Sequence, residues 1–205
     1  MGFFKKIAVK PWLPTDQEAA QIESEGFIVP DRKVGLIVFL AVATSLFFLF
    51  FSAYHMRIDL TTDWVAIPEP PLLWVNTVVL VLCSIMFERA KAAGKSNDMT
   101  LMRSRFLIAG VLTLAFLAGQ LIVWFQMQSM GYTLQGNPSS GFFYLMTGVH
   151  GVHILGGLVA WGRAALRMKT DEDLEAASVS VDLCALYWHF LLLVWLGIFA
   201  LLMNT

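Results

Sequence analysis

Five apolar stretches, each about as long as a lipid bilayer is thick, constrain the fold of this chain more than any other feature. They cover residues 34–56, 71–88, 106–130, 142–162 and 183–204. The hydrocarbon core of a bilayer is about 30 Å thick, and an α-helix crosses it with roughly 20 residues. Because lipid offers no hydrogen-bond partners, these segments must satisfy their own backbone groups as helices. The sequence therefore predicts an all-α fold, an integral membrane bundle of five transmembrane helices within residues 34–205.

The composition agrees with a membrane protein. Hydrophobic residues make up 58% of the chain and charged residues only 14%, against about 25% charged residues in soluble domains. The net charge of -1 indicates no nucleic-acid partner. Both cysteines, Cys83 and Cys184, lie in apolar stretches and are typical of small buried hydrophobic residues.

Lysine and arginine are unevenly divided between the two sides of the predicted bundle. Of the 14, only Arg57 lies on one side, and the other 13 lie in the N-terminal arm, the second loop and the fourth loop. Since positive charge marks the cytoplasmic side, we expect the N-terminus inside and the C-terminus outside. Residues 1–33 then form a cytoplasmic arm, whose residues 1–14 are predicted to lie along the membrane interface.

Three histidines lie inside the apolar stretches, where an ionisable side chain is costly. His150 and His153 are in the fourth stretch and His189 is in the fifth. On a helix the first two project about 60° apart, and Gly157 shares their face. Small residues allow a neighbouring helix to approach closely, so we expect this face to pack against protein. The imidazoles would then bind backbone carbonyls, Gln120 of the third stretch, or each other.

Other roles for these histidines remain open. A haem held by two imidazoles would take one from each of two helices, such as His153 and His189, and would make the chain a haem b-binding redox subunit. A contact with a proton or a lipid headgroup in a larger complex is another role. A zinc or copper site is less favoured, because no third ligand stands at helical spacing beside the pair. The absence of an internal repeat disfavours a transporter.

Four segments carry motifs of a known family. The segments "SSGFFYLMTGVHGVHILGGL" and "LYWHFLLLVWLGIFALLM" resemble the last two helices of subunit III of haem-copper respiratory oxidases, in its short five-helix form. The segments "VNTVVLVLCSIMFERA" and "FLAGQLIVW" are similar to the second and third helices of that family. The resemblance extends over all five stretches, in order and with the same topology.

The resemblance implies a non-catalytic subunit of a bacterial inner-membrane oxidase. Such a subunit packs against the catalytic subunit I, with subunit II and possibly subunit IV as further neighbours. It stabilises subunit I, binds phospholipids and supports proton delivery, while the haems and copper belong to the partner subunits. The resemblance leaves open whether the complex is a cytochrome c oxidase or a quinol oxidase, and related proteins accompany nitric oxide reductases. It implies no metal ligand in this chain, and interface positions at His150, His153, Gly157, Gln120, Trp188 and His189.

Three acids that are common within the membrane in this family are absent. Apolar residues stand in their places, near Ala43 in the first stretch, at Val123 in the third and at Leu192 in the fifth. Structural and lipid-binding roles do not depend on these acids, whereas a direct proton-buffering role would. The sequence therefore favours the structural and lipid-binding roles.

Overall fold

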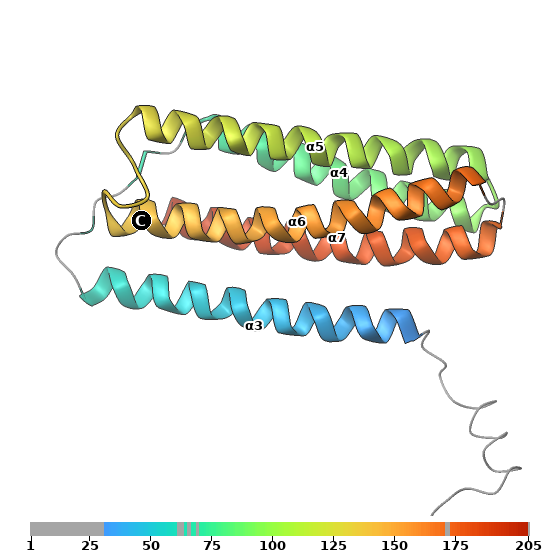
Figure 1. Ribbon diagram of the computed structural model, residues 1–205, viewed down its shortest axis with the longest axis horizontal. Helices are drawn as coiled ribbons and strands as arrows, with labels where there is room; N and C mark the ends of the chain where they lie inside the picture. The colour runs from blue at the N-terminus through green and yellow to red at the C-terminus, as the bar shows by residue number, and fades with distance from the viewer. Residues whose placement is uncertain (1–30, 61–63, 65–66, 69, 171–172, 205) are drawn as a thin grey trace, which may run out of the picture. The chain divides into compact units, whose positions relative to one another are not determined.

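The computed structural model describes residues 31–60, 64, 67–68, 70–170 and 173–204. The regular structure of this part of the chain is entirely helical (Figure 1). Its helices are α3 (Asp31–Leu60), α4 (Leu72–Lys95), α5 (Met99–Ser129), α6 (Pro138–Thr170) and α7 (Leu174–Met203). Each is long and apolar enough to cross a membrane, which confirms the predicted all-α membrane fold. The predicted interfacial segment at residues 1–14 lies outside the described residues.

The helices α5 and α7 begin before their apolar stretches, where an aspartate side chain caps each of them. The helix α5 begins seven residues before Phe106, where the Asp98 side chain accepts a hydrogen bond from the Leu101 backbone N–H at 2.9 Å. The Asp173 side chain caps α7 in the same way. These carboxylates satisfy backbone N–H groups that have no partner inside the helix.

Residues 38–205 form one compact unit, which contains all the contacts described here. Within it, α4 lies next to α5 and α7, and α6 lies next to the same two helices, so the four form a closed ring (Figure 1). Large rings fill the space between them. Phe87 packs on Trp188 with ring centroids 4.5 Å apart, and Phe116 packs edge-on against Trp195 at 5.0 Å.

Glycines allow these helices to approach one another. A Cβ atom at Gly110 of α5 would lie 2.0 Å from the Trp161 ring of α6. At Gly119 of α5 it would lie 2.1 Å from Oδ1 of Asn76 on α4. Real Cβ atoms do not come this close to other heavy atoms, so both positions need glycine for the helices to pack as they do.

The helix α3 packs on the ring through a few large side chains. Phe47 and Tyr54 are buried in a cluster with Met146 of α6 and with Val194 and Ile198 of α7. Most other side chains of α3 are exposed, including Val42, Phe48 and Leu49. In a membrane these side chains meet lipid or another protein.

Candidate functional site

Tryptophan indoles and threonine hydroxyls pair between helices throughout the bundle. In each pair the indole N–H donates to a hydroxyl oxygen on another helix, so a buried donor is satisfied without water. The pairs are Trp188–Thr113 (2.9 Å), Trp195–Thr77 (3.0 Å) and Trp124–Thr147 (3.1 Å). They link α7 to α5, α7 to α4, and α5 to α6.

His150 lies at the centre of this packing and is 1% exposed. Its Nε2–H donates to the backbone carbonyl of Leu191 on α7 at 3.0 Å. Its ring packs between Phe116 and Trp195, with centroids 5.9 and 5.3 Å away. This imidazole therefore joins α6 to α7 through a hydrogen bond in an aromatic pocket.

His153 faces a different neighbour. Its Nδ1–H donates to the Val149 carbonyl of its own helix at 2.8 Å, and its ring lies against Phe47 and Phe39 of α3. The backbone carbonyl of His153 accepts a hydrogen bond from the Tyr187 hydroxyl at 2.8 Å. The turn that contains His153 thus contacts both α3 and α7.

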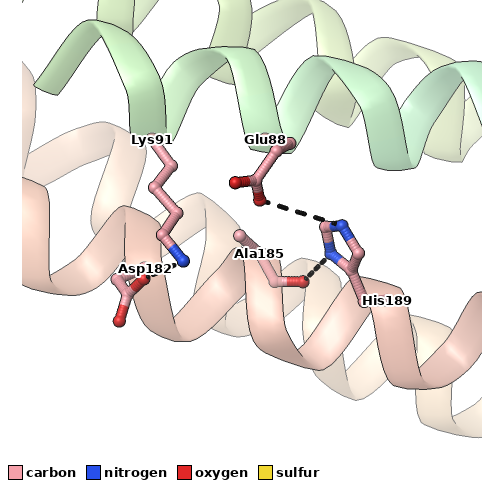
Figure 2. A network of polar contacts seen from close by, with 5 residues as sticks. All are labelled: Glu88, Lys91, Asp182, Ala185 and His189. Carbon is pink, nitrogen blue, oxygen red and sulfur yellow. Dashed lines mark hydrogen bonds and ion pairs between the residues drawn. The ribbon is translucent and has the colours of Figure 1, made fainter. Parts of the chain in front are cut away.

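His189 points outwards from α7 towards α4, as Figure 2 shows. Its Nδ1–H donates to the Ala185 carbonyl, and its Nε2 lies 3.8 Å from the Glu88 carboxylate. One turn along α4, Lys91 forms an ion pair with Asp182 at 2.7 Å. The two pairs connect α4 to α7 near the end of α4.

The positions of these rings do not support a haem held by His153 and His189. The ring of His153 lies against α3, whereas the ring of His189 faces α4, so the two imidazoles do not face each other across a common space. Over the described residues, no group of three or more His, Cys, Asp or Glu side chains could hold a metal ion.

Gln120 does not meet the histidines. It is buried, and its Oε1 accepts a hydrogen bond from Nδ2 of Asn76 at 3.3 Å. Its Nε2 is buried too and has no hydrogen-bond partner among the described residues. The amide pair links α4 to α5 at the point where Gly119 leaves room for Asn76.

Glu88 is the polar residue that the sequence reasoning overlooked. It stands at the end of the second apolar stretch, and α4 continues past it to Lys95. The contact with His189 joins residues about 100 positions apart in the chain, so no local pattern indicates it. A carboxylate next to an apolar stretch is the only signal that the sequence offers.

The three positions at which the resemblance implies intramembrane acids lie wholly or partly inside the protein. Ala43 and Val123 are buried, and Leu192 is partly buried. In this chain these positions contribute apolar packing and no ionisable group.

A groove with a volume of about 620 Å³ lies between α5 and α6. A Cβ atom at Gly148 would make ordinary van der Waals contact with the Trp124 ring, at 3.6 Å. Trp124 and Tyr144 are held by hydrogen bonds to Thr147 and to the Tyr132 carbonyl. The residues that line the groove are Trp124, Gln128, Leu134, Tyr144, Leu145, Gly148, Val149 and Val152.

These features define a class of protein: a multi-span membrane bundle whose interior polar side chains hold its helices together. Sequence comparison specifies the family. The chain belongs to the cytochrome c oxidase subunit III family, because the model of that family matches residues 18–204. It is thus a subunit III of a haem-copper oxidase, and membership implies association with other oxidase subunits.

Individual relatives agree. Cytochrome c oxidase subunit 3 of Synechocystis sp. is 32% identical over 84% of this chain and 75% of its own length. Cytochrome c oxidase subunit 3 of Thermostichus vulcanus is 29% identical over 88% of this chain and 95% of its own length. The probable cytochrome c oxidase subunit 3 of Nocardia farcinica is 29% identical over 82% of this chain and 85% of its own length.

Proposed function

We propose that this chain is a non-catalytic subunit that stabilises the haem-bearing subunit I of a bacterial inner-membrane oxidase. The observation that carries this proposal is the use of the intramembrane histidines. His150 binds a carbonyl of a neighbouring helix, and His153 binds a carbonyl of its own helix while its ring packs on α3. Imidazoles used in this way support the shape of the bundle. Subunit II and a fourth subunit are further neighbours.

The electron donor of the complex is cytochrome c. The names of the relatives support this choice over quinol, since each is a cytochrome c oxidase subunit 3 or a probable one. Oxidation of reduced cytochrome c by the complex purified through this chain tests it. Oxidation of quinol alone would contradict it.

The chain is oriented with its N-terminus in the cytoplasm. The distribution of lysine and arginine supports this orientation. A reporter enzyme that is active only outside the cytoplasm should be active when it is fused after Thr205 and inactive when it is fused before Met1.

Phospholipid binds in the groove between α5 and α6. The groove is lined mainly by apolar side chains, and the whole segment from Phe106 to Gly162 carries no formal charge. Its volume lies within the range of roughly 300–1,000 Å³ that small-molecule sites occupy. An acyl chain is the membrane component that fits an uncharged, mainly apolar surface.

Removal of this chain from the purified oxidase tests the stabilising role. We expect the initial rate of oxygen reduction to stay close to that of the complete complex. The number of turnovers before inactivation should fall, because the surface of subunit I that the chain covers becomes exposed. Adding the chain back should restore the lifetime. Equal lifetimes with and without the chain would contradict the proposal.

A further inference from the structure

Two ionisable side chains lie exposed on the face formed by α4 and α7. The side chain of Glu88 is 56% exposed and that of His189 is 44% exposed. Both point out of the bundle and towards each other (Figure 2). We call the surface formed by Glu88, His189, Lys91 and Asp182 the α4–α7 polar face.

Part of this face lies within the apolar region of the helices. The apolar stretch of α7 begins after Asp182, and His189 stands about 10 Å further along the helix at 1.5 Å per residue. Exposed apolar side chains flank the pair, with Ile85 on α4 and both Leu186 and Leu193 on α7. Ionisable residues at membrane depth usually face protein or an aqueous cavity. This exposed pair therefore indicates a surface that protein covers in the assembled complex.

The charges on the face indicate which chemical groups the molecule that covers it should present. Lys91 and Asp182 neutralise each other across 2.7 Å. The distance of 3.8 Å between Glu88 and His189 is too long for a hydrogen bond, and Nδ1–H of His189 already donates to Ala185. Lys91 also interacts electrostatically with Glu88. With two carboxylates, Glu88 and Asp182, and one ammonium group, the face has one carboxylate in excess, and the Glu88 carboxylate can accept hydrogen bonds from another molecule.

Arg89 follows Glu88 in the chain, so its side chain projects about 100° further around the helix. Its backbone carbonyl accepts a hydrogen bond from the Arg105 side chain of α5 at 3.0 Å. This part of α4 is thus in contact with α5.

We propose that the α4–α7 polar face docks a transmembrane helix of the haem-bearing partner, and that this helix presents an arginine or lysine to Glu88. The inference rests on the proposed function, since it assigns the surface through which the chain joins the oxidase. The cation completes the hydrogen bonds of the carboxylate, and Ile85, Leu186 and Leu193 pack against the apolar side chains around it. Polar contacts of this kind hold transmembrane helices together.

Charge reversal tests the cation. The complex is purified through a tag on the full-length chain, and haem is measured per tagged chain. Glu88→Arg should lower the retained haem by about tenfold or more, because it places two cations together at a desolvated contact. Glu88→Asp should keep most of the haem. The control Glu175→Gln, at the exposed start of α7, should match the wild type.

The wild-type sample separates the two proposals. If the wild-type chain retains no haem-bearing subunit, the proposed function fails. If the wild type retains it and Glu88→Arg does so equally, the docking proposal alone is overturned. If Glu88→Arg retains the haem but loses phospholipid, a lipid headgroup occupies the face, and the docking proposal is again overturned. Equal amounts of tagged chain in the membrane, with equal helical content, show that the variant has folded.

Photo-crosslinking tests the face without altering Glu88. A photoreactive amino acid replaces Leu186, which lies twelve residues after the first residue of α7. The control position is Val111, twelve residues after the first residue of α5 and more exposed, at 62% against 37%. Leu186 should crosslink to the haem-bearing subunit in the membrane, and Val111 should not. Equal crosslinking from both positions, or none from Leu186, would overturn the proposal.

Discussion

Thr113 shows how single residues hold this bundle together. It is fully buried in α5 and accepts the indole N–H of Trp188 at 2.9 Å. Its hydroxyl lies 3.1 Å from the Cys83 sulfur and donates to the Ala109 carbonyl. One small side chain thus links α4, α5 and α7.

Replacing Thr113 with valine keeps its volume and removes the hydroxyl. The N–H of Trp188 then loses its acceptor in the interior, which costs roughly 1–3 kcal/mol. We expect thermal unfolding in detergent to shift to a lower temperature. Thr44→Val is the matched control, because that hydroxyl is exposed and bonds to its own helix. Equal melting temperatures for the two variants would contradict the role of Thr113.

His150 and His153 show how much of a side chain's surroundings can be predicted from the sequence. Their spacing predicts a shared side of α6, with imidazoles that bind backbone carbonyls, Gln120 or each other. The angle of about 60° between them is enough for one ring to contact α7 and the other to contact α3. Which helix stands on each side depends on the packing of the whole bundle, so the spacing alone does not reveal it.

At the scale of elements, glycines determine how closely the helices approach. A Cβ atom at Gly157 of α6 would lie 2.6 Å from the Tyr187 ring of α7. A Cβ atom at Gly156, one residue earlier, would have no other heavy atom within 4 Å. These adjacent residues form a matched pair for testing the contact between α6 and α7.

Gly157→Ala should separate the two helices and destabilise the bundle by about 1–3 kcal/mol, as overpacking does. Gly156→Ala should be neutral or stabilising by up to about 1 kcal/mol, because alanine favours helix. The yield and the melting temperature of the two variants in detergent check this. If Gly157→Ala assembles as well as Gly156→Ala, the packing between α6 and α7 differs from the one described.

The five helices could be predicted from the sequence because length and apolar content suffice for a membrane span. Which helices lie next to one another could not be predicted, because these helices are apolar on nearly all sides and carry no stripe that marks a core. Glycine content alone does not identify contacts either. Gly151 and Gly156 suggest close approach as strongly as Gly157 does, yet only Gly157 meets another helix.

The groove between α5 and α6 gives a prediction about lipid. Gly148→Leu should extend a side chain into the groove and lower the phospholipid that co-purifies with the complex. Phosphorus analysis per complex measures this, with Gly162→Leu as a control because nothing lies within 4 Å of that site. Equal phosphorus in both variants would show that lipid does not depend on this groove.

At the scale of the whole molecule, the chain should contribute no haem ligand to the oxidase. His153→Gln removes one of the two imidazoles that a haem site in this chain would need. We expect the amount of haem per complex, measured as its pyridine complex, to stay at the wild-type value. Loss of one haem per complex would show that His153 ligates iron.

The most direct test of the account is the absorption spectrum of the complex purified through a tag on this chain, before and after the chain is dissociated. We predict strong haem absorption in the intact complex and none in the released chain, whose histidines bind carbonyls or pack between helices. Haem absorption that stays with the released chain, or an intact preparation without haem, would contradict the account.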